Sequence, residues 1–264
     1  TFSYKDQKTP VIEQTAAFEN DRQKVEVSVV KQDAENETVV AGAEFGLYAK
    51  EDILAHGEVA VKADTLLGKA VSNEDGKAVF ELDLPFGSYY IKELAAPAGY
   101  VSSFETLEVT AKYQGQDVKV VKLESVFKNQ PTKVTFKKSD ITTGVELSGA
   151  TLTVLDKDGN VIDTWKSVKG EEHLIERLTA GETYTLREEM APYGYLKAEE
   201  ITFTVEDTAE IQKVEMKDDV PTGTILINKN GEFLDKVTPL DSVGGWISHL
   251  FQYVTGNLKD VTFE

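Results

Sequence analysis

Two short stretches of the chain, residues 89–93 and 184–188, constrain its fold most strongly. In each, two apolar or aromatic residues alternate with polar ones and so share one face of a β-strand. The next residue on that apolar face is Glu93 in the first stretch and Glu188 in the second. A buried carboxylate costs several kcal/mol unless it is paired or neutralised. Both glutamates therefore need partner groups.

The stretches belong to an internal repeat of roughly 90 to 110 residues. Each is followed by Ala-Pro-x-Gly-Tyr, at residues 96–100 and 191–195, and the order of strand-like segments restarts at Thr132. Many short alternating segments separated by turn signals predict an all-β chain of tandem immunoglobulin-like β-sandwiches. Pro131 and Pro221 mark the joins, which gives two central domains at 23–130 and 131–220, flanked by segments 1–22 and 221–264.

The tail shows a different spacing. Apolar residues recur there every three or four positions, which predicts one short helix that packs on its own domain. Asp241 or Ser242 would be its N-cap and Gly256 its C-cap. A membrane or partner helix is less favoured because the stretch is not basic. The apolar residues are Val243, Trp246, Ile247, Leu250, Phe251 and Val254.

Composition excludes several classes of function. The net charge of −18 over 264 residues opposes binding to nucleic acid or to anionic membranes. There is no cysteine, and His56, His173 and His249 lack the spacing of metal ligands, so we expect no metal and no cofactor. The turn at 156–160 lacks the downstream glutamate of a calcium loop. No membrane span or signal peptide is visible, and we interpret the chain as a piece of a longer protein.

Each repeat places a lysine, a glutamate and an amide or acid on apolar strand faces. In the first repeat they are Lys31, Glu93 and Asn129, and in the second Lys138, Glu188 and Asp218. The two-residue period of a strand selects Glu188 over Glu189 and Asp218 over Asp219. The same trio in the same order, twice, indicates a shared chemical role.

Burial lowers the pKa of lysine and raises that of a carboxylic acid, so both can be neutral near pH 7. A neutral lysine amine can attack the carbonyl carbon of Asn129 or of protonated Asp218. The glutamate would relay a proton to the departing ammonia or water. The product would be an amide cross-link made once per molecule. The alternative is a buried, hydrogen-bonded Lys–Glu–Asp network that never reacts.

Each repeat resembles a Cna B-type domain in the order of four features. These are a strand that carries the lysine, a Gly-Ala segment at 42–43 or 149–150, the glutamate followed by Ala-Pro-x-Gly-Tyr, and a final strand that ends in Asn or Asp. These prealbumin-like, SpaA-type repeats build stalks of Gram-positive surface adhesins and pilins. The resemblance covers residues 24–129 and 133–218. It implies a Lys31–Asn129 bond with Glu93 as the catalytic residue, and a Lys138–Asp218 bond with Glu188.

The resemblance also interprets both ends. Residues 1–22 would hold the closing strand of a preceding module, around 12–18, and 221–264 the start of a truncated one, whose opening strand carries Ile225 and Ile227. Asn20 and Lys229 would be halves of cross-links completed outside this chain.

The sequence therefore predicts a stalk segment of a cell-wall-anchored, extracellular adhesin or pilus-like protein, joined to neighbouring modules and without enzymatic turnover. The alternative function is a module that binds host glycans or extracellular matrix through loops at one sandwich end. An enzyme acting on external substrates is least favoured, because every candidate acid points inward.

Overall fold

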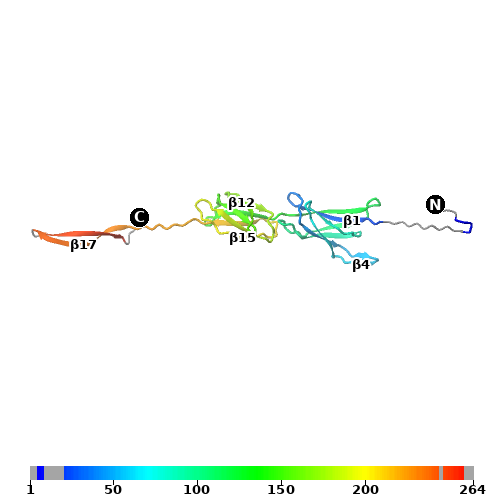
Figure 1. Cartoon of the computed structure of the whole chain (residues 1–264), viewed down its shortest axis with the longest axis horizontal. Helices are drawn as coiled ribbons and strands as arrows, with labels where there is room; N and C mark the ends of the chain where they lie inside the picture. The colour runs from blue at the N-terminus through cyan, green and yellow to red at the C-terminus, as the bar shows by residue number, and fades with distance from the viewer. Residues whose placement is uncertain (1–4, 9–20, 244–245, 259–264) are drawn as a thin grey trace. The chain divides into compact units, whose positions relative to one another are not determined.

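The computed structural model describes residues 5–8, 21–243 and 246–258, and these contain β-strands, turns and irregular segments without any helix. The chain divides into two compact units, residues 1–219 and 220–264. The first unit holds both repeats, each built from two principal sheets (Figure 1). The prediction of an all-β chain with tandem sandwiches is confirmed.

The first repeat packs a three-stranded sheet, in the order β6-β1-β9, against a four-stranded sheet, β5-β2-β7-β8. A hairpin of β3 and β4 projects from it (Figure 1). The strands are β1 (Lys24–Asp33), β2 (Glu44–Ala49), β3 (Ile53–Ala55), β4 (Glu58–Val61), β5 (Leu66–Val71), β6 (Lys77–Phe80), β7 (Gly87–Ala95), β8 (Thr106–Ala111) and β9 (Val120–Asn129).

The second repeat repeats this plan with sheets β13-β10-β16 and β12-β11-β14-β15. Its strands are β10 (Lys133–Asp140), β11 (Thr151–Leu155), β12 (Val161–Lys166), β13 (His173–Glu176), β14 (Thr183–Met190), β15 (Ile201–Thr204) and β16 (Gln212–Asp218). In both repeats the first and last strands lie side by side and run parallel, as β1 with β9 and β10 with β16.

Alternating side chains form one apolar core in each repeat. In the first, the rings of Phe45 on β2 and Phe127 on β9 meet edge to face at 5.3 Å, which joins the two sheets. In the second, Phe136 on β10 contacts both Trp165 on β12 and Phe203 on β15, at 5.3 and 5.4 Å. The sheets are thus held together by aromatic contacts close to the predicted site residues.

The predicted helix in the tail is wrong. Residues 230–257 form an antiparallel hairpin of β17 (Asn230–Val243) and β18 (Trp246–Asn257), so Asp241, Ser242 and Gly256 lie within strands and cap no helix. Aromatic and β-branched residues favour strands, and the backbone of β17 supplies their pairing partners, as in Val237 with Phe251. Adjacent apolar residues such as Leu250 and Phe251 obscure the two-residue alternation of a strand, which made the spacing in this sequence resemble that of a helix.

The expected strands at the two ends have different outcomes. Residues 12–18 and Asn20 lie outside the described residues. Ile225 and Ile227 lie in a segment, residues 221–229, that forms no strand, so the opening strand predicted there is wrong. Lys229 is exposed in the same segment, and its role as half of a cross-link stays a prediction.

Within the part of the chain that the structure describes, no helix could cross a membrane.

Replacement of Phe45 by alanine should lower the unfolding free energy of the first repeat by about 3 to 5 kcal/mol, because its buried ring links the two sheets. The matched control is Phe104→Ala, because Phe104 is 97% exposed, and its effect should stay within about 0.5 kcal/mol. Urea unfolding followed by NMR signals of the first repeat measures both. Equal losses in the two variants would contradict the assigned core.

Candidate intramolecular cross-link sites

A β-bulge sets the orientation of each predicted glutamate. Glu93 on β7 pairs with the buried Phe45, and the register then shifts, so that Leu94 is passed over. In the same way Glu188 on β14 pairs with the buried Leu152 and Glu189 is passed over. A bulge inserts one extra residue and re-aims the side chains around it. Each glutamate thus stays on the core face at the point where the regular alternation ends.

The parallel pairing of first and last strands brings the lysine to its partner. Lys31 pairs with Phe127 on β9, and Asn129 lies two residues further along the same face. Lys138 pairs with Met216 on β16, and Asp218 lies two residues beyond it. The sequence period placed these side chains on core faces, and the register now places them beside each other.

In the first repeat, Glu93 binds the side-chain amide of Asn129. The Nδ2 group of Asn129 donates to Oε1 and Oε2 of Glu93 at 2.8 and 2.7 Å, and to the Val101 carbonyl at 2.8 Å. Lys31 is fully buried, and its Nζ donates to the Gln32 carbonyl at 2.9 Å. Lys31 and Asn129 are buried and Glu93 is half-buried, so the set lies largely out of water.

In the second repeat the three side chains contact one another directly. Lys138 Nζ donates to Asp218 Oδ1 and lies 2.9 Å from Glu188 Oε1. The side chains of Lys138 and Glu188 are entirely buried, and Asp218 is 1% exposed. The structure therefore brings together all three residues predicted for this repeat.

Burial shifts the pKa values of Lys31, Glu93 and Asp218 in the direction that an amide condensation needs. Burial lowers the pKa of Lys31 to about 8, although the charges of Glu93 and Asp33 oppose the shift. Burial also raises the pKa of Glu93, against hydrogen bonds from Asn129 and Ser103 and the charge of Lys31. In the second repeat burial raises the pKa of Asp218, and Glu188 acts in the same direction while Lys138 opposes it.

Unsatisfied polar atoms gather at these two sites. Among the described residues, the buried side-chain nitrogen and oxygen atoms without a hydrogen-bond partner are Asn129 Oδ1, Glu188 Oε1 and Asp218 Oδ2. The Glu188 oxygen contacts the Lys138 ammonium as an ion pair without hydrogen-bond geometry. Native proteins leave few buried polar groups unpaired, and such groups call for a functional explanation.

Sequence reasoning missed the backbone groups that hold the two glutamates. The Ser103 N–H donates to Glu93 Oε2 at 3.0 Å, and the Ala198 N–H donates to Glu188 Oε2 at 2.7 Å. Each donor lies ten residues after its glutamate, beyond the Ala-Pro-x-Gly-Tyr segment. The repeated Ala-Pro-x-Gly-Tyr segment could have indicated these donors, because it leads the chain back to the carboxylate after the same number of residues in both repeats.

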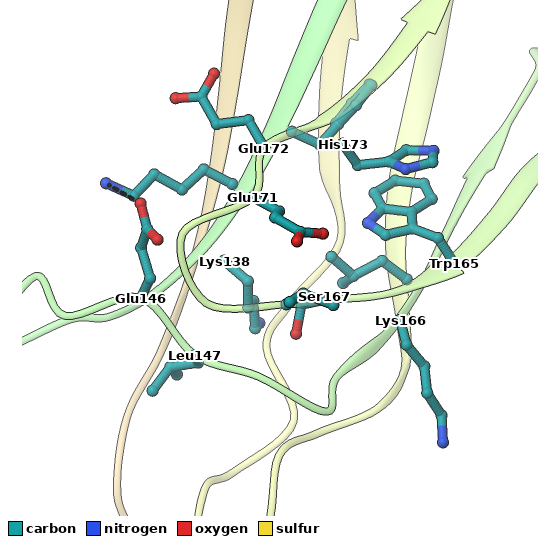
Figure 2. A pocket seen from close by; sticks show the side chains of 13 residues that line it. Lys138, Glu146, Leu147, Trp165, Lys166, Ser167, Glu171, Glu172 and His173 are labelled. Carbon is teal, nitrogen blue, oxygen red and sulfur yellow. Dashed lines mark ion pairs between the residues drawn. The ribbon is translucent and has the colours of Figure 1, made fainter.

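A cavity of about 80 Å³ adjoins the second set, with Lys138 among its lining residues (Figure 2). At its rim the Trp165 and His173 rings are stacked at 4.1 Å, and His173 Nε2 lies 2.7 Å from Asp163 Oδ2. No group of three or more potential metal ligands occurs in the described residues. The cavity thus forms part of the surroundings of Lys138.

The fold and the two sites define a class of tandem β-sandwich modules. In each module a glutamate of one sheet faces a lysine on the first strand and an amide or acid on the last strand of the other sheet. Residues 25–125 and 132–220 match the family model of the SpaA prealbumin-like fold domain. These matches cover more than half of the chain, and the chain belongs to this family. No curated protein matches it.

Similar solved structures include proteins of Bacillus anthracis, Lactobacillus rhamnosus GG and Streptococcus agalactiae. The Bacillus anthracis TIE protein is 21% identical, with a TM-score of 0.48, over 89% of this chain and 44% of that one, so this chain spans less than half its length. A C-terminal fragment of the pilus adhesin SpaC from Lactobacillus rhamnosus GG is 16% identical, with a TM-score of 0.49, over 77% and 100% of the two chains. GBS52, a minor pilin of Streptococcus agalactiae, is 19% identical, with a TM-score of 0.32, over 76% and 99%.

The stability of an Asn129→Ala chain should rise with pH between about 8 and about 9, below the pH near 10 at which tyrosines ionise. Folded Lys31 loses its proton near pH 8, whereas unfolded lysine keeps it to about 10.5. The unfolded state therefore binds more protons in this window, and the unfolding free energy increases with pH. Urea unfolding of the first repeat at several pH values measures it.

The control is the double variant Asn129→Ala, Lys31→Met, which carries no titrating group at this position. The difference in stability between the two chains should change with pH across the window. A constant difference would show that Lys31 titrates normally in the folded protein.

Proposed function

We propose that this chain is a structural stalk segment of a Gram-positive, cell-wall-anchored adhesin or pilus-like protein, and that each repeat closes itself with an isopeptide bond. The observation that carries the proposal is the set of three residues in each repeat, in which the lysine and the amide or acid lie on the first and last strands and the glutamate on the other sheet. The unsatisfied buried side-chain atoms of the described residues lie in these two sets. Membership of the SpaA family supports the structural role. The partners would be neighbouring modules of the same protein.

In the first repeat the neutral Lys31 amine attacks the Asn129 side-chain carbonyl carbon. The new bond joins Lys31 Nζ to Asn129 Cγ, and the bond from Cγ to Nδ2 breaks. Glu93 takes a proton from the attacking amine and delivers it to Nδ2, which it already holds at 2.7 Å. Ammonia leaves and takes up the proton that Lys31 released on becoming neutral, so that atoms and charge balance.

In the second repeat the same attack on Asp218 releases water. The reaction requires a protonated acid, because a carboxylate resists attack, and burial moves Asp218 in that direction. Lys138 Nζ bonds to Asp218 Cγ, and the hydroxyl leaves with a proton that Glu188 relays from the amine. The 2.9 Å contact between Lys138 Nζ and Glu188 Oε1 supports this role.

Neither bond would turn over, because the product amide remains part of the domain core. The glutamates are therefore single-use catalytic residues, and the chain is no enzyme toward external substrates. The alternative function, binding of host glycans or matrix by sandwich-end loops, stays a prediction.

The intact mass of the purified chain should be lower than its sequence mass by about 35 Da, because one ammonia (about 17 Da) and one water (about 18 Da) are lost. Glu188→Ala should recover about 18 Da while Glu189→Ala, the matched control on the neighbouring exposed residue, recovers nothing. High-resolution mass spectrometry with peptide mapping assigns each bond. An unshifted wild-type mass would refute the cross-links.

Loss of the second bond should also lower stability. Lys138 and Asp218 are 80 residues apart, and a cross-link closing such a loop contributes about 4 to 5 kcal/mol through the unfolded state. Glu188→Ala should lose about this amount, and Glu189→Ala little. Trp165 fluorescence in urea follows the second repeat, with Trp246→Phe in all chains to remove the other indole. Equal stability of the Glu188→Ala and control chains would contradict a covalent contribution.

A further inference from the structure

The turn after β13 brings Arg177 of the second repeat against the first repeat. Arg177 has a left-handed backbone (φ 64°), which is uncommon for a residue other than glycine. Its N–H donates to the Thr132 carbonyl at 2.9 Å. Its backbone lies against Gly99 so closely that a Cβ on Gly99 would be 2.6 Å from the Arg177 carbonyl oxygen. The second repeat thus docks on the Ala-Pro-x-Gly-Tyr segment of the first.

The Arg177 side chain makes two hydrogen bonds across this junction. Its Nη2 donates to Asp33 Oδ2 at 2.9 Å, and its Nε donates to the Tyr100 hydroxyl oxygen at 3.1 Å. The Tyr100 hydroxyl in turn donates to Asp33 Oδ2 at 3.0 Å. The Asp33 side chain is fully buried, whereas that of Arg177 is 42% exposed. A surface arginine of one repeat therefore neutralises a buried acid of the other.

This buried acid belongs to the surroundings of Lys31. Asp33 follows Lys31 by two residues on β1, so both side chains start from the same face of the strand. The Lys31 ammonium lies 5.3 Å from the centre of the Tyr100 ring. Without Arg177, Asp33 would be a buried carboxylate whose available cation is Lys31. It would then compete with Asn129 for the lysine.

We propose that Arg177 is a positioning residue for the first repeat: by pairing with Asp33 and Tyr100, it keeps Lys31 free of Asp33 and leaves its amine available to Asn129. Docking of the second repeat thereby completes the environment in which the first repeat reacts. This inference rests on the proposed cross-link for its functional meaning, but its electrostatic part holds for an unreacted chain as well.

The second repeat provides an internal comparison. Asp140 follows Lys138 by two residues on β10, and Tyr195 hydrogen-bonds to it as Tyr100 does to Asp33. Asp140 Oδ1 accepts hydrogen bonds from the Thr142 and Thr143 N–H groups. In the described part of the chain no cation pairs with Asp140. The arginine is therefore specific to the first site, and the second bond should not respond to its removal.

The charged and titratable groups around Lys31 come from several elements. Asp33 on β1, Glu93 on β7 and Tyr100 in the following loop face it, and Asp207 of the second repeat acts on Glu93. Asp33 stays ionised, because hydrogen bonds from Arg177, the Glu35 N–H and Tyr100 outweigh its burial and hold its pKa below the usual range. Removal of Arg177 takes one positive charge away and frees Asp33. Both effects favour a protonated Lys31.

The test is the titration of Lys31 by NMR of ¹³C-labelled lysine in the full chain, in an Asn129→Ala background that cannot react. Arg177→Gln should raise the Lys31 pKa by about one unit, and Arg177→Lys should restore most of the original value. Arg187→Gln is the matched control, because Arg187 pairs with Glu189 at the surface of the second repeat. An unchanged Lys31 pKa in Arg177→Gln would overturn the proposal.

The rate of bond formation provides the functional readout. Chains that retain Asn129 are made by cell-free translation, captured in denaturant and refolded over a pH series. The Lys31–Asn129 peptide is then quantified against time. Arg177→Gln should slow this bond about tenfold below the Lys31 pKa and shift its pH profile upward by about one unit. The Lys138–Asp218 bond should form at its normal rate, which shows that the second repeat has folded.

The two readouts separate the two ideas. A wild-type chain that never forms the Lys31–Asn129 bond refutes the proposed function, and the Lys31 titration still decides whether Arg177 acts as proposed. A normal rate and pH profile in Arg177→Gln, with the wild-type bond present, would refute the positioning role.

Discussion

The structure of each repeat depends on the burial of a lysine ammonium between two sheets. The free-energy cost of burying an isolated charge is larger than the stabilisation that the packing of one side chain provides. The surroundings must therefore supply a partner for the charge or neutralise it. The parallel pairing of the first and last strands and the bulge after Glu93 or Glu188 together aim an acid and an amide or second acid at the lysine. The aromatic contacts that join the sheets exclude water from the same region.

The two repeats compensate the charge of the buried lysine in different ways. In the first, the opposite charges of Lys31 and Glu93 act on each other beside the neutral amide of Asn129, and the additional acid, Asp33, pairs with Arg177 from the second repeat. In the second, Lys138 faces two acids, so charge balance requires one proton to be shared, and burial raises the pKa of Asp218 accordingly. The asparagine repeat thus takes a cation from its neighbour and the aspartate repeat takes a proton, while Asp140, the counterpart of Asp33, is held by backbone N–H groups without a cation. The junction between the repeats is part of the first site for this reason.

The sequence predicted the sandwich fold and the core-facing position of the six site residues because both follow from a two-residue period. The period cannot show which strands become neighbours, so the parallel pairing that joins Lys31 to the Asn129 face had to come from the structure. The role of Arg177 could not be predicted from the sequence either. Arg177 follows β13, a short strand with little alternation, and its partner Asp33 lies 144 residues earlier in the chain. In the tail, adjacent apolar residues such as Leu250 and Phe251 hide the two-residue alternation, and the pairing of β18 with β17 identifies the strand.

The position of the proposed bonds within the strands determines how a stalk would bear load. In a parallel pair, the chain enters at the start of the first strand and leaves at the end of the last one. Lys31 and Asn129 lie near the ends of β1 and β9, so a pulling force entering at Lys24 would pass along β1 and through the bond into the linker. The same holds from Lys133 through Lys138 to Asp218. The hydrogen bonds between the remaining strands of each repeat would then carry little of the force. Between the repeats, the force would act on the short linker at 130–132. Arg177 contacts this linker through the Thr132 carbonyl and also binds Asp33 near Lys31, so tension in the linker would affect the environment of Lys31.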